Sequence, residues 1–411
     1  MVTPWFLIDN TLPKAQELRA NFTAHRAGLY HRIPVLWYIK AMSRPKTIAL
    51  IIGGFVLLIL LLAGAGILWL SANEYKPADL EAVPISPANL EAVPVSPALT
   101  PGPARFQPIE IISWNIGYAS LDAKEDFFMD GGKKTRPDTA GSVAENMRAI
   151  RDFISAAAAD VFFMQEVDVN SKRSYNLNQV RDLSENWKGS SAFALNFKCP
   201  FVPIPFPQFI GKVESGIQTL NSYSSTADRI SLPSPFSWPE RVAQLKRCLL
   251  VTRVPLQGDG TAGNAPELVL VNLHLEAYDT GGAGRQAQTR LLAQFLLDEY
   301  ARGNYCVAGG DFNQVFPAVK DVFPVEANEY FTPGVVDGSL FGEGWVLAAD
   351  PYAPTCRSLD KPYDGNREGH QFYLIDGFIL SPNVELISVQ TVDLDFKNSD
   401  HNPVKLTFRL R

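Results

Sequence analysis

The residues best suited to chemistry lie where short apolar segments end in polar side chains. These endings carry carboxylates, amides and histidines, and they are Ser113–Asn115, Gln165–Glu166, Asn272–His274, Gly310–Asn313 and Ser399–Asn402, with Asp376 inside the run YLIDGFIL. A carboxylate at the end of a buried strand costs roughly several kcal/mol unless a cation or hydrogen-bond donors compensate it. We therefore expect each of these carboxylates to have a partner.

Together the endings supply oxygen ligands and proton-transfer groups. The carboxylates are Glu166, Asp311, Asp376 and Asp400, the amides are Asn115 and Asn313, and the histidines are His274 and His401. Mg²⁺, with Mn²⁺ as the other candidate, favours such oxygen donors, whereas zinc would draw more histidine and cysteine. A metal and the amides would stabilise charge on a phosphate while other groups activate water and protonate the leaving oxygen. The set therefore predicts metal-assisted phosphoester hydrolysis.

Taken singly, each ending has an ordinary structural explanation. A Gln-Glu pair is typical of a salt-bridged strand end, and an Asp-His pair is common in turns. The distribution of histidines favours function, because His25 and His31 precede a long apolar run and His370 lies in a Gly-rich loop. Of five histidines, the other two both fall in the set above.

Composition and cysteine spacing bound the class of protein. The chain has 411 residues, is 46% hydrophobic and carries a net charge of -6, which is typical of a folded protein and gives no sign of a chain built around a nucleic-acid backbone. A local basic cleft can still sit on an acidic protein. The four cysteines form no CxxC pair, so neither a zinc site nor a dense disulfide framework is predicted, and one bridge stays open.

Strands and helices must position these side chains. Apolar, β-branched runs predict strands at 109–113, 161–165, 268–273, 373–380 and 404–408. Helical spacing is found in two places, at Val143, Met147, Ile150 and Ile154 and at Leu291, Leu292, Phe295 and Leu296. The pattern predicts one mixed α/β domain over residues 108–411.

The run from Ile48 to Leu70 contains no charge and no proline. At about 1.5 Å per residue it can cross a hydrocarbon core of roughly 30 Å. A buried core helix would show a polar face, and a cleaved signal peptide would have a shorter apolar core and a better cleavage site than Leu70-Ser71-Ala72. Positive residues precede the span at Arg26, Arg32, Lys40, Arg44 and Lys46. The run therefore predicts an uncleaved signal anchor in the cell membrane, with the N-terminus cytoplasmic and the α/β domain extracytoplasmic.

We divide the chain into a short cytoplasmic segment (1–47), the transmembrane signal anchor (48–70), a Pro-rich linker (71–107) and the α/β domain (108–411). The linker holds the tandem repeat ADLEAVPISP–ANLEAVPVSP, and its prolines predict an extended, semi-stiff stalk. Whether Met1 or Met42 is the true start stays open.

The ordered series WN, QE, NLHL, GDFN, DGFILS and SDHNPV resembles the endonuclease/exonuclease/phosphatase superfamily from about Ile109 to Phe408. This superfamily includes deoxyribonuclease-like enzymes and neutral sphingomyelinases. The resemblance implies a four-layer α-β-β-α sandwich of two mixed sheets, here preceded by one transmembrane helix. It also implies an active site at one end of the sheets.

The same resemblance implies a metal site for Mg²⁺, or for Mn²⁺. Glu166 would be the principal ligand, with Asn115 beside it holding metal or phosphate. Asp400 would contribute to a second or shared metal position, so the number of metals stays open.

The resemblance also implies catalytic roles. Asp311 and Asn313 would position the attacking water and the phosphate, and Asp376 would orient His401. His274 resembles the general acid of the deoxyribonuclease-like and sphingomyelinase-like branches. Activation of water is assigned jointly to Asp311 and His401.

The sequence leaves the substrate between a phospholipid headgroup and a nucleic acid. The loop FKCPFVPIPFPQF (197–209) cannot form a regular central strand, and it either contacts a lipid or packs over the domain's own core. Further cations are available for phosphate contacts or plain solvation at Lys133, Lys134, Arg136, Arg173, Lys246 and Arg247. No protein partner is predicted, and endo or exo cleavage, diester or monoester specificity and oligomeric state stay open.

A catalytically inactive extracytoplasmic binding module that retains the fold is the alternative function. Loss of Glu166 or of either motif histidine would favour it, and none is missing. No Asn-x-Ser/Thr sequon follows the span, which is in keeping with a bacterial surface protein.

Overall fold

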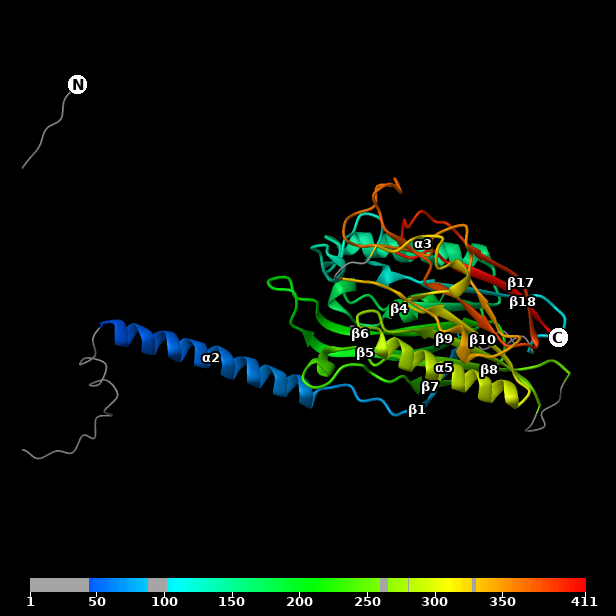
Figure 1. The fold of residues 1–411 in the computed structure, drawn as a ribbon, viewed down its shortest axis with the longest axis horizontal. Coiled ribbons are helices and arrows are strands. Elements are labelled where there is room, and N and C mark those ends of the chain that lie inside the picture. Colours follow the sequence, from blue (N-terminus) through cyan, green and yellow to red (C-terminus); the bar gives the residue numbers. More distant parts are fainter. Residues whose placement is uncertain (1–43, 88–101, 186, 259–264, 280, 327–329) are drawn as a thin grey trace, which may run out of the picture. The chain divides into compact units, whose positions relative to one another are not determined.

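The computed structural model describes residues 44–411 except 88–101, 186, 259–264, 280 and 327–329 (Figure 1). It divides the chain into two units, residues 1–63 and 64–411. Helix α2, Arg44–Ala72, contains the predicted span, and its apolar stretch has a mean hydropathy of 2.9, so it is long and apolar enough to cross a membrane. Most of the predicted cytoplasmic segment and the second repeat copy lie outside the described residues.

Two seven-stranded mixed sheets build the second unit. The first sheet has the order β1 (Leu80–Val83), β7 (Thr226–Ser231), β8 (Cys248–Pro255), β9 (Glu267–His274), β10 (Tyr305–Asp311), β16 (Asp376–Leu380) and β13 (Val346–Ala348). The second has the order β17 (Val384–Thr391), β18 (Val404–Leu410), β3 (Ile109–Asn115), β4 (Val161–Asp168), β6 (Gly211–Asn221), β5 (Ser190–Val202) and β2 (Ile85–Pro87). The pairs β9–β10 and β3–β4 are parallel, so their carboxyl ends lie together.

The period-2 alternation of side chains explains how the sheets stack. Along β3, Ile109 and Ile111 pack into the core between the sheets, whereas Ile112 and Trp114 pack against helix α3 (Ala140–Ala157). Helix α5 (Ala283–Ala301) covers the outer face of the first sheet through residues such as Leu292. Figure 1 shows α3 and α5 on opposite sides of the sheets, so the predicted four-layer α-β-β-α sandwich is confirmed.

Short elements connect the sheets. They are α4 (Gln179–Glu185), β11 (Gln314–Val315), β12 (Gly334–Val335), β14 (Cys356–Arg357) and β15 (Phe372–Tyr373), and the 3₁₀ turns η1 (Gly117–Ala119), η2 (Phe128–Asp130), η3 (Lys172–Ser174), η4 (Glu240–Ala243), η5 (Pro317–Val319) and η6 (Gly338–Leu340). The predicted strand at 373–380 is therefore split, because Asp376 starts β16 after a break.

The first repeat copy does not form the expected stalk. Strand β1 pairs with β7 of the first sheet, and β2 pairs with β5 of the second, so the segment adds an edge strand to both sheets. The prediction of an extended stalk was therefore wrong for this copy. Prolines are tolerated at sheet edges, and Pro84 stands between the two strands where the chain passes from one sheet to the other.

The loop predicted at 197–209 is largely a hairpin. Strand β5 continues to Val202 and pairs with β6 as far as Val202 opposite Gly211, with a register break around Pro200, and the other prolines lie in the turn that joins the two strands. Cys199 is therefore buried in a strand rather than in a loop, and Cys356 opens β14. All four cysteines are buried and free, so the disulfide left open by the sequence is not formed.

Candidate active site

Parallel pairing brings several predicted site residues to one end of the sheets. In the register of the first sheet, Asp311 stands directly opposite His274 on β9 and opposite Asp376 on β16. In the second sheet, Asn115 ends β3 and pairs with Gln165, the residue before Glu166. The carboxyl ends of β3, β9 and β10 and the amino end of the antiparallel strand β16 therefore form one polar edge.

Glu166 is turned into this edge by a bulge in β4. The pairing of β4 with β6 shifts register between Met164 and Val167, and the backbone of Glu166 has φ +55°, which is uncommon for a residue other than glycine. Such strain persists only when the surrounding structure imposes it, and it is concentrated at functional sites.

The GDFN segment requires glycine before the aspartate. Gly310 has φ +146°, and a Cβ atom there would lie 2.0 Å from the carbonyl oxygen of Leu273 on β9. A side chain at this position would push β9 and β10 apart. It would then separate Asp311 from His274.

Asp311 is the centre of the hydrogen-bond network. The Asn115 side chain donates Nδ2–H to Asp311 Oδ2 at 3.0 Å, and the Asn313 backbone donates to Oδ1 at 2.9 Å. Nε2 of His274 lies 3.4 Å from Asp311 Oδ2, and Nε2 of His401 lies 3.7 Å from it. Burial and the Asp376 carboxylate raise the pKa of Asp311 to about 7.

The two histidines have opposite electrostatic surroundings. Burial and the nearby Arg247 charge hold the pKa of His274 well below its ordinary value, so this ring is neutral. Burial would also lower the pKa of His401, but the Asp376 carboxylate, whose Oδ2 lies 2.8 Å from His401 Nδ1, raises it well above its ordinary value. The structure therefore pairs a neutral histidine with a charged one on either side of Asp311.

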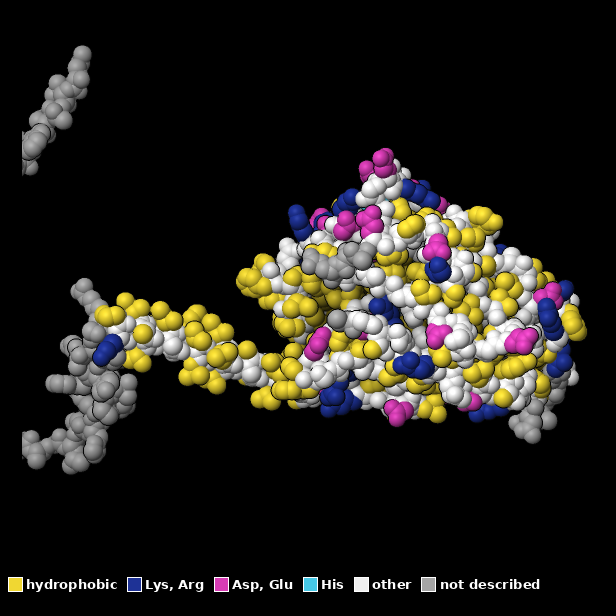
Figure 2. Space-filling model, viewed as in Figure 1, with side chains coloured by type: hydrophobic (Ala, Val, Ile, Leu, Met, Phe, Trp, Pro, Cys, Tyr) yellow, Lys and Arg dark blue, Asp and Glu magenta, His cyan; other side chains and the backbone are white. Residues whose placement is uncertain are grey.

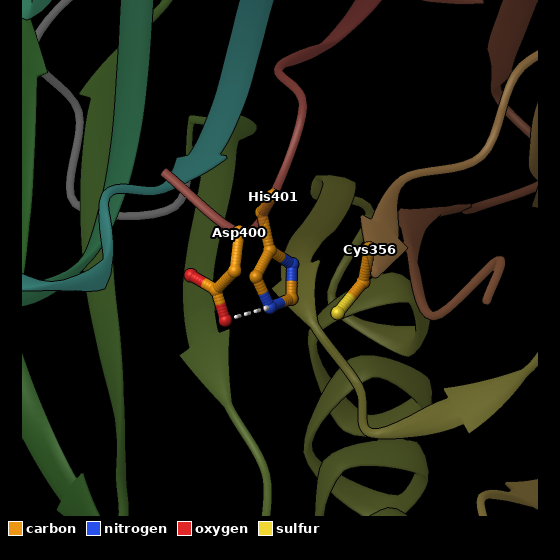
Figure 3. A group of neighbouring side chains, drawn as sticks. All are labelled: Cys356, Asp400 and His401. Atoms are coloured by element: carbon orange, nitrogen blue, oxygen red, sulfur yellow. Dashed lines mark ion pairs between the residues drawn. The ribbon is translucent and has the colours of Figure 1, made fainter. Parts of the chain in front are cut away.

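Cys356 also contacts this group, although no motif in the sequence includes it. Ligand atoms of Cys356, Asp400 and His401 lie within 4.8 Å of one another, and Figure 3 shows the thiol pointing toward the His401 ring from the neighbouring strand. Burial raises the pKa of the Cys356 thiol to about 12, so it remains protonated. We attribute to it a packing contact with His401.

Seven of the eight predicted site residues line a single pocket of about 510 Å³. They are Asn115, Glu166, His274, Asp311, Asn313, Asp400 and His401. Asp376 does not line the pocket and lies behind His401. The Asn313 side chain donates Nδ2–H to the carbonyl oxygen of Leu275 at 3.0 Å.

The donors fit a divalent cation. Glu166, Asp311 and Asp400 crowd carboxylate oxygens into the pocket, and burial raises the pKa of all three, with the Asp400 charge adding to the effect on Glu166. Asn115 adds an amide whose Nδ2 lies 3.4 Å from Glu166 Oε1. A hard cation would relieve this repulsion among oxygen donors.

Two of the six predicted cations also reach the pocket. Arg173 stacks over the Tyr118 ring at 3.7 Å and pairs with Asp168 at 3.0 Å. Arg247 is 5% exposed and lies 3.5 Å from Glu276, but its Nε and Nη1 atoms make no hydrogen bond. The other four cations do not line the pocket. Lys134, for example, pairs with Glu125 at 3.0 Å.

The sequence did not single out Tyr118, Tyr278 or Arg357, which also line the pocket. Tyr278 donates its hydroxyl to Asp130 at 3.0 Å, and burial raises the pKa of Asp130 to about 7. Arg357 donates Nη2–H to the carbonyl oxygen of Asp122 at 2.7 Å. Tyr118 lies shortly after the WN motif in the chain, and this proximity is the one sequence feature that could have identified any of these three residues as part of the site.

Comparisons with known proteins agree with this architecture. The model of the endonuclease/exonuclease/phosphatase family matches residues 112–358. The structure of an endonuclease/exonuclease/phosphatase from Beutenbergia cavernae DSM 12333 is 18% identical, covers 74% of this chain and 72% of its own, and has a TM-score of 0.51, which shows a shared fold.

Two further solved structures are similar at lower scores. An endonuclease/exonuclease/phosphatase from Bacteroides vulgatus is 17% identical over 74% of this chain and 100% of its own, with a TM-score of 0.45. TDP2 from Caenorhabditis elegans is 15% identical over 74% and 75%, with a TM-score of 0.43. No curated protein matched the chain.

Proposed function

The chain belongs to the endonuclease/exonuclease/phosphatase family, and from this premise we propose that it is a membrane-anchored, divalent-metal-dependent phosphodiesterase. Members of this family are hydrolases of phosphoester bonds. The observation that carries the proposal is the convergence of seven predicted residues on one pocket, with the eighth directly behind it. In the reaction one water adds to phosphorus, one ester P–O bond breaks, and the leaving oxygen takes a proton.

The metal would be held by Glu166 and Asp400, with Asn115 beside them, and Mg²⁺ or Mn²⁺ suits these oxygen donors. When bound, it would withdraw charge from the phosphate oxygens. Burial raises the pKa of both carboxylates, and the Asp400 charge adds to the effect on Glu166, so a bound cation would favour the charged form of each.

The protein's own groups would divide the proton transfers. Asp311 and His401 would activate the attacking water together: Asp311, whose pKa lies near 7, would take the proton of the water, and charged His401 would bind the phosphate beside it. Asp376 would hold the His401 ring through the 2.8 Å contact. The negative charge of a bound phosphodiester beside His274 would raise the pKa of this ring, so that it takes a proton from solvent and then gives it to the leaving oxygen as the general acid. Asn313 would fix the turn of GDFN through its bond to Leu275 rather than touch phosphate directly.

The anchor would be α2, with the N-terminus cytoplasmic and the phosphodiesterase domain outside the cytoplasm. The length and hydropathy of Pro45–Ala72 support a single membrane span. The positive residues before the span support this orientation. Bacterial origin is part of the same proposal and draws on the absence of glycosylation sequons after the span.

The test is hydrolysis by the full chain in detergent micelles, with Mg²⁺ or with EDTA. The substrates are bis(4-nitrophenyl) phosphate as a generic diester, plasmid DNA, RNA and phospholipids. We expect metal-dependent cleavage that is lost in Glu166→Gln and in His401→Ala. The absence of any cleavage, together with no Mg²⁺ binding by calorimetry, would instead support the inactive binding module.

A further inference from the structure

The pocket has an apolar half that phosphoester chemistry does not require. We define the apolar arm as Leu70, Phe197, Val202, Ile204, Ile210 and Val242, all of which line the pocket that holds the site residues. All but Ile204 belong to one buried hydrophobic cluster. A pocket of about 510 Å³ lies within the size range of small-molecule sites, and its apolar half needs an apolar occupant.

The arm is poorly suited to a nucleic acid. Among the pocket-lining residues at 196–210 and 239–245, the single charged residue is Glu240, an anion. Neighbouring cations are already paired, since Lys246 and Arg241 contact Glu74 at 3.1 and 2.9 Å. Nucleic-acid binding depends on a series of free cations along the phosphate backbone, whereas the described cations nearest the arm, Lys198 included, are paired with carboxylates.

One wall of the arm is the end of the apolar helix itself. Ile67 and Leu70, in the last turns of α2, line the pocket, and Leu70 is 8% exposed. The chain is attached here, because Trp238 donates Nε1–H to Ser71 Oγ at 3.0 Å and Glu74 pairs with Arg241. These residues belong to the same helix as the stretch that we propose spans the membrane, so the arm lies close to the bilayer along the chain.

Large apolar side chains are exposed at the rim of the arm. Phe206 is 85% exposed, Trp238 57% and Ile204 50%. Figure 2 shows hydrophobic side chains gathered at the tip of the β5–β6 hairpin, where Phe206 and Phe209 make an edge-to-face contact with centroids 6.0 Å apart. Exposed aromatic groups of this kind are costly in water and typical of membrane interfaces.

Arg247 supplies the polar complement. It lies shortly after the arm residue Val242 in the chain, lines the same pocket, and is buried with Nε and Nη1 making no hydrogen bond. Its Nε lies 3.5 Å from Glu276 Oε2, so the guanidinium has one carboxylate neighbour and still has N–H donors without a hydrogen bond, for which an anionic phosphate is a natural acceptor.

We propose that the substrate is a phospholipid of the bilayer that holds α2, with an acyl chain in the apolar arm and the headgroup phosphodiester at the polar site. The inference rests on the proposed phosphodiesterase function. The lipid would enter from the bilayer past Phe206 and Trp238. Arg247 would contact its phosphate.

The experiment uses the full chain reconstituted in phosphatidylcholine and phosphatidylglycerol vesicles with Mg²⁺, with products identified by mass spectrometry. The matched substrates are the same lipids after deacylation, which keep the phosphodiester but lack acyl chains. Bis(4-nitrophenyl) phosphate and single-stranded DNA complete the set. We expect the acylated lipids to be cleaved at least about tenfold faster than their deacylated counterparts at equal phosphate concentration.

The variants test the arm without removing a site residue. Ile204→Asp places a charge in the arm at a half-exposed position, and Ile204→Leu preserves its apolar character. We expect the ratio of vesicle cleavage to bis(4-nitrophenyl) phosphate cleavage to fall about tenfold or more in Ile204→Asp and to be kept in Ile204→Leu. Tyr352→Asp, at a side chain that is 89% exposed and does not line the pocket, is the control.

The outcomes separate the two proposals. No cleavage of any substrate would overturn the phosphodiesterase proposal. If the generic diester is cleaved, three results would each overturn the lipid inference alone. They are equal rates on acylated and deacylated lipids, faster cleavage of DNA than of lipids, and an unchanged ratio of vesicle to generic-diester cleavage in Ile204→Asp.

Discussion

Replacing Asp376 by asparagine tests whether His401 works through a buried charge. Asp376 Oδ2 lies 2.8 Å from His401 Nδ1, and the two side chains are 2% and 5% exposed. Unit charges about 4 Å apart interact by about 4 kcal/mol at an effective dielectric of about 20. Asparagine keeps the shape and loses the charge, so kcat should fall by about 10³-fold, since about 1.4 kcal/mol corresponds to a factor of ten.

The assay is release of 4-nitrophenol from bis(4-nitrophenyl) phosphate by the full chain in micelles with Mg²⁺. KM should change little, because Asp376 does not line the pocket and acts through His401. Asp321→Asn is the control, since this carboxylate is 84% exposed. A variant that melts at the wild-type temperature and retains kcat within tenfold would refute the idea that the Asp376 charge sustains His401.

Three further predictions concern stability. Asn272 accepts from Gln165 Nε2 at 2.8 Å between the sheets, so Asn272→Leu should lower the free energy of unfolding by about 1–3 kcal/mol in thermal melts, unlike exposed Gln294→Leu. Burial would raise the pKa of Glu299, but hydrogen bonds from Arg253 and Asn304 lower it below 4.5, so its contribution is present above pH 4.5 and lost as pH falls through the folded value. Glu299→Gln should therefore melt lower at pH 7, with the difference from wild type shrinking below pH 4.5; a constant difference would count against the pairing. Mg²⁺ at about 100 times its Kd should stabilise the wild type by about 2.7 kcal/mol and Glu166→Gln much less, as scanning fluorimetry would show.

The sequence predicted the strands that carry chemistry better than the rest of the sheets. Buried runs such as 161–165 and 268–273 are continuous and apolar, and they appear as the cores of β4 and β9. Strands β5 and β6 were missed because register breaks and prolines disrupt their alternation. This hairpin is held by pairing between two distant segments up to Val202 opposite Gly211, which local propensity does not reveal.

The candidate site shows a similar limit. Motif order identified Glu166 and Asp311, and strand pairing brings them to one pocket. The sequence could not show that Asn313 turns toward Leu275, or that Cys356 packs on His401, because these contacts depend on backbone geometry between segments distant in the chain. From the sequence, Arg247 was one of six cations suggested for phosphate contacts. Its burial, which only the structure shows, distinguishes it from exposed cations.

The first repeat copy determines where the chain can be truncated to produce a soluble α/β domain. A soluble fragment that starts at Pro108 would lack β1 and β2 and leave β7 and β5 as open sheet edges, which invite pairing with other molecules. It would also leave Lys246 without Glu74, whose side chain is 3% exposed. A fragment that begins at Glu74 keeps both edge strands and this ion pair, so aggregation of the shorter fragment would reflect where it was cut rather than an intrinsic insolubility of the enzyme.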